Sequence, residues 1–333
     1  MKTILITGFP ALLIGALALT SCASASAPAA STTGSSVSSC GIGLTVPAAP
    51  ERAVSLEQGA TEVLLALGLQ DRMVGTSYLT DAVAPEFADA YAQVPVLAEQ
   101  YPSTEQLRET EPDFVYSMRS SAFSSDAGGS RQELVDLGVP AYLSSNDCED
   151  PSLIASDVGF DQIAAEVMDI ATIFDATERG EAIVTEQEDA LTEVEEAASS
   201  VGEPSVVWLY SSIEGSPVVA GANGLAQTMG DLAGATNAFD DLDAQWGETS
   251  WDEIAQRDPD VIVVADLSRG LAGDSAADKI STLRADAVTS GLTAVREDHL
   301  VAIPATELDP SVRSVHAVQA LSAALVEMSE ETR

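Results

Sequence analysis

Basic side chains are scarce in this sequence of 333 residues, which has 14 lysines and arginines against 53 aspartates and glutamates. Lys2 and Lys279 are the only lysines, so the other basic residues are all arginines. The formal net charge of −39 opposes binding to nucleic acids and to anionic membrane surfaces, because both repel a strongly acidic protein. The excess of acids is typical of a solvated acidic surface, and it makes each arginine outside a helix informative.

Histidine and cysteine are also rare. His299 lies in a polar turn and His316 in the last helical segment, and both positions favour a structural role. A transition-metal site needs several histidines, cysteines or carboxylates in one place. No pair of cysteines, or of a cysteine and a histidine, has the spacing of metal ligands. We therefore expect no bound metal, no resident cofactor and no role in binding free zinc or manganese.

The common catalytic motifs are missing as well. The sequence has no Gly-x-Ser-x-Gly elbow, no Ser-x-x-Lys pair, no phosphate-binding loop and no His-Glu-x-x-His. An acidic cluster lacks the spacing of a calcium loop; it contains Asp240, Asp241, Asp243 and Glu248. We expect no catalytic residues. A secreted hydrolase with paired carboxylates and a surface lipoprotein that only contacts other proteins stay open as alternatives.

The N-terminus has the pattern of an export signal. Lys2 precedes an apolar run over residues 4–19 that is short for a membrane span. The run ends in Leu-Thr-Ser-Cys, which resembles a bacterial lipobox, so we expect residues 1–21 to be removed and Cys22 to be lipidated. A plain secretory signal with a chance cysteine is the alternative. The expected location is the outer face of the cytoplasmic membrane, with the membrane touched only through the lipid.

Residues 22–40 are almost entirely Ala, Ser, Thr, Pro and Gly, which predicts a disordered tether. The two remaining cysteines, Cys40 and Cys148, would share an oxidising compartment, which favours one disulfide. That bond would join the start of the folded region to the end of its first half. Two free buried cysteines are the alternative.

Two consecutive amphipathic helices are predicted over residues 158–201. Apolar residues recur there at steps of three and four, with acids on the other face. The sequence Asp175-Ala176-Thr177 separates them, and Asp175 or Thr177 could cap the second helix. At 1.5 Å per residue, about 20 residues span roughly 30 Å, the width of a small domain.

The segments before and after these helices echo one another. Residues 105–115 and 252–262 both read as a short helix, then acid-Pro-Asp, then an apolar strand. Residues 60–68 and 225–234 are each a helix that closes on glycine. Alternating strands and helices build mostly parallel sheets. We predict an α/β fold with an N-terminal lobe over 41–157 and a C-terminal lobe over 202–333, two Rossmann-like lobes joined by a long rigid helix. Chance is the alternative, since this connection is common.

The ordered motifs resemble those of bacterial substrate-binding proteins for iron-siderophore and cobalamin importers, the periplasmic binding proteins with a bridging helix. The resemblance runs from Arg52 to the last helix. It rests on Arg-Ala-Val-Ser-Leu at 52–56, the helix 60–69, the two Pro-Asp-strand segments and Trp251-Asp252-Glu253. It implies a ligand held between the lobes, delivery to an ABC permease with its ATPase, and no chemistry. We expect a monomer.

The same resemblance implies that one acid on each lobe docks on arginines of the permease. Glu105 matches the first position. The second falls on Asp252, with Glu253 next to it, and relatives often have glutamate there, so both stay candidates. Acids favoured by the dipole at the start of an exposed helix are the alternative explanation.

Ligand-binding residues are expected where loops follow the carboxyl ends of strands. Arginine suits carboxylates or phosphates, and aromatic rings suit flat groups. A surface or core role is open for each candidate. The candidates are Gln58, Tyr78, Tyr101, Arg119, Ser145, Asn146, Tyr210, Trp246, Arg269 and Arg313.

A narrower resemblance points to an actinobacterial subgroup proposed to import a precursor of a deazaflavin coenzyme. It rests on residues 124–131, Cys148, residues 208–212 and residues 312–315. Three candidate arginines would suit the phosphodiester and carboxylate of that precursor. The expected ligand is thus a ferric siderophore or a similar chelate or anion, with a corrinoid or a deazaflavin as alternatives.

Overall fold

Two β-sheets covered by helices organise the computed structural model, which describes residues 34–154, 158–213, 215–268 and 272–331. Both sheets belong to one compact unit, Thr33–Arg333. The N-terminal sheet has five strands in the order β5-β4-β3-β6-β7, and every neighbouring pair is parallel. Its strands are β3 (Ala53–Leu56), β4 (Met73–Ser77), β5 (Val96–Ala98), β6 (Phe114–Ser117) and β7 (Ala141–Leu143).

Short helices connect the strands of this lobe. They are α1 (Gln58–Ala66), α2 (Ala88–Tyr91), α3 (Thr104–Glu109) and α4 (Arg131–Asp136). Capping boxes fix the starts of α3 and α4, where Ser103 and Ser130 accept hydrogen bonds from the backbone amides of Gln106 and Glu133. These helices are too short to be stable alone, so their buried faces on the sheet hold them in place.

The C-terminal sheet has six strands, in the order β11-β9-β8-β12-β13 with β10 pairing β8. Its core is parallel, as predicted, but β9 and β11 are antiparallel additions at one side. Only two residues separate β8 from β9, which is too short for a parallel crossover. The strands are β8 (Ser205–Ile213), β9 (Ser216–Ala220), β10 (Thr236–Asn237), β11 (Trp246–Glu248), β12 (Val261–Asp266) and β13 (Leu300–Pro304).

Helices pack on both faces of this second sheet. Ala317, Val318 and Leu321 of α11 share one buried cluster with Trp208, while Ile254 of α8 and Leu283 of α9 belong to a separate cluster. The sheet is therefore buried on both sides, as its continuous apolar strands require. The helices are α7 (Leu225–Leu232), α8 (Trp251–Arg257), α9 (Ala276–Ala285), α10 (Thr293–Arg296) and α11 (Ser314–Glu331).

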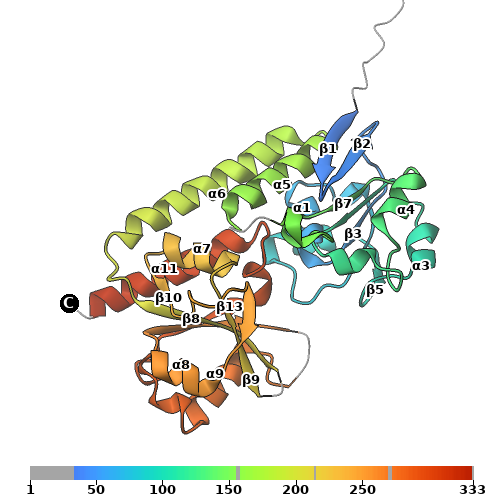
Figure 1. The fold of residues 1–333 in the computed structure, drawn as a ribbon. Helices are drawn as coiled ribbons and strands as arrows, with labels where there is room; N and C mark the ends of the chain where they lie inside the picture. The colour runs from blue at the N-terminus through green and yellow to red at the C-terminus, as the bar shows by residue number, and fades with distance from the viewer. Residues whose placement is uncertain (1–33, 155–157, 214, 269–271, 332–333) are drawn as a thin grey trace, which may run out of the picture. The chain divides into compact units, whose positions relative to one another are not determined.

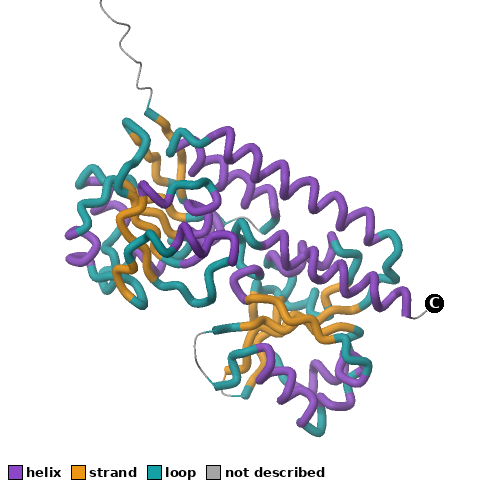
Figure 2. Tube along the Cα trace, turned by 180° about the vertical axis from the view of Figure 1, so that it is seen from behind, coloured by secondary structure: helices purple, strands orange, loops and turns teal. Residues whose placement is uncertain are grey.

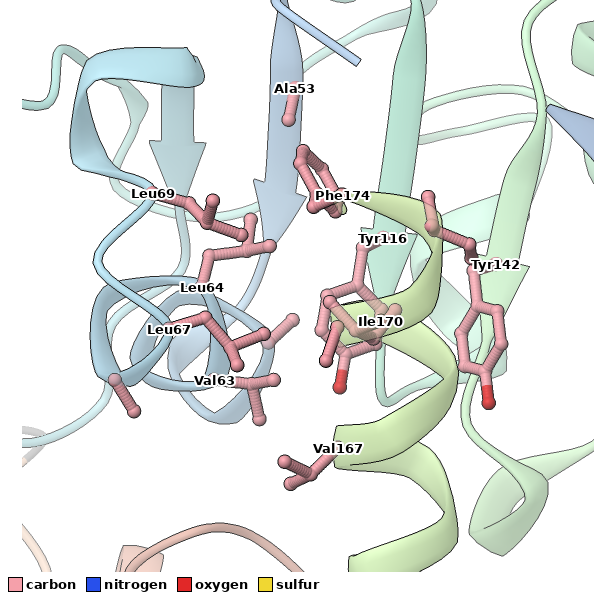
Figure 3. Packing of buried hydrophobic residues seen from close by; sticks show 14 of the residues in the cluster. Ala53, Val63, Leu64, Leu67, Leu69, Tyr116, Tyr142, Val167, Ile170 and Phe174 are labelled. Atoms are coloured by element: carbon pink, nitrogen blue, oxygen red, sulfur yellow. The ribbon is translucent and has the colours of Figure 1, made fainter. Parts of the chain in front are cut away.

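Helices α5 (Phe160–Ile173) and α6 (Thr177–Ala198) run from one lobe to the other (Figures 1 and 2). At the first lobe, α5 packs against α1, and Figure 3 shows their side chains meeting. At the second lobe, Ile163 of α5 and Val194 of α6 join the core around Trp208. Both helices thus contribute to both cores, which makes the predicted bridge a paired one. The buried side chains in Figure 3 include Val63, Leu64, Leu67, Val167 and Ile170.

The predicted cap of the second helix is wrong. The N-cap of α6 is Ala176, and no side chain caps the helix there. Asp175 instead adopts a φ of 56°, in the left-handed region, where it forms the sharp turn between the two helices.

The predicted tether is too long, because residues 35–39 form a strand. Strand β1 (Ser35–Ser39) pairs antiparallel with β2 (Ile42–Val46). The hydroxyl of Ser39 donates to the carbonyl of Leu143 and accepts from its amide. The guanidinium of Arg131 donates to the carbonyl and the hydroxyl of Ser39, each at 2.8 Å. Hydrogen bonds to the N-terminal lobe therefore order a segment whose composition alone predicts disorder.

The predicted disulfide is present. Cys40 follows β1 directly, and its sulfur bonds to that of Cys148, which lies beyond β7, at a sequence separation of 108 residues. The bond holds the hairpin on the N-terminal lobe. Among the described residues, no helix has both the length and the apolar character that a membrane crossing needs.

The lysine of α9 is buried. Lys279 is only 6% exposed, and its ammonium donates to the carbonyl of Ala265 in β12. This lysine therefore links α9 to the end of β12 and is not exposed to solvent.

Candidate functional site

A cavity of about 400 Å³ lies between the two lobes, at the carboxyl ends of their strands. Residues from the loops after β3, β6 and β7 line it from the N-terminal lobe, and residues of β8, β9, α7, β11 and the loop after β13 line it from the C-terminal lobe. A groove between two sheets at their carboxyl ends is where open α/β folds bind ligands. The cavity is within the size range of sites for drug-sized molecules.

Glu57 forms part of the N-terminal wall and has an unusual backbone. Its φ of 107° and ψ of 172° lie in a region that only glycine adopts without cost. Its carboxylate caps α1 by accepting from the amides of Gly59 and Ala60, and it also accepts from the amide of Met118 at 3.3 Å. Burial raises the pKa of Glu57, against the lowering effect of these amides. The turn thus fixes a carboxyl group at the cavity.

Arg119 follows β6 and lies on the same wall. Its Nη2 is 2.7 Å from Oδ1 of Asp309, a residue of the C-terminal lobe. The carboxylates of Asp309, Glu57 and Asp147 raise the pKa of Arg119. Its guanidinium is therefore already neutralised by carboxylates of the protein.

The C-terminal wall is aromatic. Tyr210 within β8 and Trp246 in β11 both line the cavity, with ring centroids 4.9 Å apart. A smaller space of about 160 Å³ adjoins it and shares Glu57, Arg119 and Tyr210. There Tyr78 and Tyr101 meet edge to face at 4.7 Å. Aromatic rings thus occur on both lobes around the two spaces.

Hydrogen bonds join the lobes beside this aromatic pair. The hydroxyl of Ser268 donates to Oδ1 of Asp81 at 2.6 Å, and that of Thr306 donates to Oδ2 at 3.3 Å. Asp81 belongs to the N-terminal lobe, whereas Ser268 and Thr306 follow strands of the C-terminal sheet. The two lobes therefore contact directly at one end of the cavity.

A buried polar cluster lies beneath the N-terminal wall. Glu166 of α5 is 4% exposed and accepts hydrogen bonds of 2.5 Å from the hydroxyls of Tyr116 and Ser144. Burial raises the pKa of Glu166 to about 7. Since Ser144 also lines the cavity, this cluster connects the bridge helices to the candidate site.

The structure brings most of the predicted ligand residues to these two spaces. Gln58, Arg119, Asn146, Tyr210 and Trp246 line the larger space, and Tyr78 and Tyr101 line the smaller one. Whether any of them contacts a ligand stays a prediction. Gln58 also has a structural role, because its side chain accepts hydrogen bonds from the amides of Thr80 and Asp81 and so joins α1 to the loop after β4.

Three predicted ligand residues are not placed at the cavity. Ser145 is exposed beside it, and Arg269 lies outside the described residues, as does Cys22. Arg313 is 6% exposed and lies 3.4 Å from Glu62 and 3.0 Å from Glu307. Its guanidinium therefore binds carboxylates of α1 and of its own lobe, instead of lining the cavity.

Several lining residues escaped the sequence analysis. Glu57 looks like an ordinary residue before a helix, and only the backbone geometry shows its position at the cavity. Asp309 and Asp147 are two acids among many in this sequence, and nothing in the local pattern singles them out. The one available signal was the Pro after Asp309, which marks a turn beyond the last strand.

The predicted docking acids differ in their surroundings. Glu105 in α3 and Asp252 in α8 are exposed and make no ion pair with another described residue. Glu253 accepts from Nε of Arg257 at 2.9 Å and is 2.8 Å from its Nη2. Glu253 therefore forms an ion pair with an arginine of its own helix.

Among the described residues, no group of three or more His, Cys, Asp or Glu side chains could hold a metal ion. His299 lies 3.1 Å from the carbonyl of Asp260, away from the cavity. The described side chains of the site thus offer hydrogen bonds, charge and aromatic faces.

Comparisons with known proteins agree with this geometry. The vitamin B12-binding protein of Yersinia pestis (strain Pestoides F) is 27% identical over 228 residues, covering 67% of this chain and 72% of that protein. A periplasmic binding protein from Veillonella parvula matches with a TM-score of 0.77 at 26% identity, covering 88% of this chain and 97% of that chain.

A second solved structure supports the fold alone. The ABC-type Fe3+-hydroxamate transport system protein from Saccharomonospora viridis gives a TM-score of 0.71 at 24% identity, covering 88% of this chain and 99% of the other. The family model described as periplasmic binding protein matches residues 54–307, which is most of the chain. The chain therefore belongs to the periplasmic binding protein family.

Proposed function

We propose that this protein captures an iron-siderophore or a similar chelate outside the cytoplasm and delivers it to an ABC permease. The observation that carries the proposal is the cavity between the lobes, with a polar wall on one side and Tyr210 and Trp246 on the other. A site of this kind buries a bulky organic ligand on its apolar face and orients it by a few polar contacts. The names of two similar proteins, which refer to vitamin B12 and to Fe3+-hydroxamate, are consistent with a chelate.

The narrower assignment to a deazaflavin precursor receives less support from the geometry. It relied on three arginines for the phosphodiester and carboxylate. Arg119 is paired with Asp309, and Arg313 is paired with Glu62 and Glu307. Arg269 lies outside the described residues and stays a predicted ligand residue, so the deazaflavin precursor remains the alternative ligand.

Lipid attachment at Cys22 is the second part of the proposal. It would keep the protein at the outer face of the cytoplasmic membrane, beside the permease. The test is to replace Cys22 with serine in the producing cell and follow the protein by fractionation. We expect the wild-type protein in the membrane fraction and the C22S protein in the soluble extracytoplasmic fraction; equal distribution would argue against the anchor.

Docking on the permease is the third part, and we assign it to Glu105 and Asp252. Both are exposed carboxylates on helices of different lobes, so together they can fix orientation and raise the encounter rate. Glu253 is the weaker candidate because Arg257 already neutralises it.

The deciding experiment for the function is native mass spectrometry of the protein from its own host under iron limitation. The preparation must include the whole hairpin, whose first strand begins at Ser35. A bound mass that matches a ferric siderophore supports the proposal, and a corrinoid or deazaflavin would replace the ligand but keep the transport role. The role would be rejected if nothing is bound and none of the three raises the melting temperature at high excess.

A further inference from the structure

The charge of the cavity narrows the ligand class further, on the basis of the function proposed above. Among the described residues that line the larger space, Glu57, Asp147 and Asp309 are acidic and Arg119 alone is basic. Asp81 adds a fourth carboxylate at the smaller space. The described lining of the larger space therefore has two more acidic residues than basic ones, and the protein as a whole has a formal net charge of −39.

Arg119 does not offer a vacant cationic site. Its Nη2 lies 2.7 Å from Oδ1 of Asp309, and Glu57 and Asp147 are close enough to raise its pKa. An anionic group that approached the guanidinium would therefore meet these carboxylates as well, because Asp309 is already bound at Nη2. Displacing Asp309 would also break a contact between the lobes.

The other positive fields that the described residues bring to the cavity are small. The N-terminus of α7 faces it, since Gly224 and Leu225 line the space, but a helix end contributes at most about half a charge. The N-terminus of α1 is already capped by the Glu57 carboxylate. Neither helix therefore offsets the excess of carboxylates.

Two features favour a positive group on the ligand. The backbone of Glu57 lies in a region that is costly for a residue other than glycine, as happens at functional sites, and this turn fixes its carboxyl group at the cavity. The C-terminal lobe adds the aromatic rings of Tyr210 and Trp246 to the same lining, and aromatic rings attract cations. A cation in the cavity would therefore have both carboxylates and aromatic rings in its lining.

We propose that the cleft selects its ligand by charge, taking cationic or neutral chelates and rejecting anionic ones, with Glu57 and Asp309 as the specificity-determining residues. Ferric tris-hydroxamates satisfy this rule, because three singly charged hydroxamates balance one ferric ion. Ferric tris-catecholates do not, because each catecholate has two negative charges.

A matched set of probes tests the proposal. Ferrioxamine B is a neutral tris-hydroxamate chelate with one free ammonium, and its N-acetylated form has the same chelate without that charge. Ferric enterobactin is the anionic tris-catecholate probe. With the purified mature protein, we expect calorimetry to rank ferrioxamine B about tenfold tighter than the acetylated form, as one charge interaction of moderate strength predicts. Ferric enterobactin should not bind.

Variants then connect the preference to the two residues. D309N and E57Q should each reduce the preference for ferrioxamine B over its acetylated form by several fold. E188Q removes one acid from the exposed face of α6, away from the cavity, and should leave the preference unchanged. Melting curves confirm folding of each variant, and if one of the two is unfolded the other carries the test.

The outcomes separate this inference from the function proposed above. Equal or tighter binding of ferric enterobactin overturns the charge rule, as does an unchanged preference in both D309N and E57Q. Binding of none of the three probes also overturns it as a rule for iron chelates. The transport role is judged independently, by whether any small molecule is bound to the protein isolated from its host.

Discussion

The two lobes contribute different chemistry to the same cavity. The N-terminal lobe supplies Glu57, Arg119 and Asp147 from tight turns after its strands. The C-terminal lobe supplies Tyr210 and Trp246, together with apolar side chains of β9 and α7. The N-terminal wall therefore acts mainly through fixed charge, whereas the C-terminal wall combines contact area with the single carboxylate of Asp309.

The lobes also differ in how they are braced. The N-terminal lobe has the disulfide, the hairpin and the buried guanidinium of Arg131, and five parallel strands. The C-terminal lobe relies on a larger mixed sheet covered on both faces. The N-terminal lobe contributes most of the charged side chains of the cavity, and it is the lobe with the disulfide. A choice of ligand by charge requires these side chains to keep fixed positions, which a rigid lobe provides.

Removing the covalent brace should give the largest effect. Replacing Cys40 and Cys148 together with serine should lower the free energy of unfolding by about 5 kcal/mol, as loop-closure entropy predicts for a loop of roughly 100 residues. Urea denaturation of the double variant measures this. Adding reductant to the wild-type protein should give the same loss, whereas reductant should not affect the double variant. Equal stability of all samples would mean that the hairpin holds without the bond.

Raising the pH should lower the stability of the N-terminal lobe, because Glu166 then loses its proton. Its pKa is raised from 4.5 to about 7 in the folded protein, so the stabilisation is complete below about pH 4.5 and is lost as the pH rises through 7. The maximum contribution is roughly 3 kcal/mol. We expect E166Q to flatten the decline in unfolding free energy between pH 5 and 8, relative to the wild type. A parallel decline in both proteins would contradict the assignment.

Removing an aromatic ring tests the other wall. W246A should weaken binding of ferrioxamine B, or of the ligand recovered from the host, by about tenfold, because stacking and contact area are both lost. W251A is the matched control, since Trp251 lies on α8 and donates to the carbonyl of Gly215 instead of lining the cavity. Isothermal calorimetry of the two variants should separate them. Similar affinities would place the ligand elsewhere in the cleft.

The smallest effect should come from the exposed docking acids. D252N should lower stimulation of the permease ATPase in proteoliposomes by a few fold, because one long-range charge contact is lost. E253Q should have less effect, because Arg257 already engages Glu253. A larger loss in E253Q than in D252N would reverse our assignment of the second docking residue.

Small-angle scattering adds a measurement of the bridge. Because α5 and α6 both pack into the two cores, the lobes should move little when ligand binds. Scattering curves that show a large closure on adding ligand would contradict this.

The fold could be predicted because its signals are local. The periodic apolar residues of α5 and α6 and the apolar runs of β8 and β12 can each be read within one segment. Fold class, the two lobes and the helical bridge followed from these. The hairpin over residues 35–46 could not be predicted, because its Ser-rich first strand is held by Arg131 and Leu143 from distant parts of the chain.

The site could be predicted only in outline. The rule that ligands meet the ends of strands led to Arg119, Tyr210 and Trp246. The pairing of Arg119 with Asp309, and of Arg313 with Glu62, joins residues far apart in sequence. Such pairs decide whether an arginine is available to a ligand, and a sequence alone does not reveal them.

The burial of Lys279 sets limits on laboratory chemistry. Its ammonium is bound to Ala265 beneath α9, and the only other lysine, Lys2, lies in the predicted signal segment. Amine-reactive dyes, crosslinkers and biosensor coupling reagents will therefore find no exposed lysine among the described residues. Carboxylates are abundant instead, so carbodiimide coupling offers handles, although it would also modify the acids that we assign to docking. Attachment through an engineered terminal tag would leave both lobes unmodified.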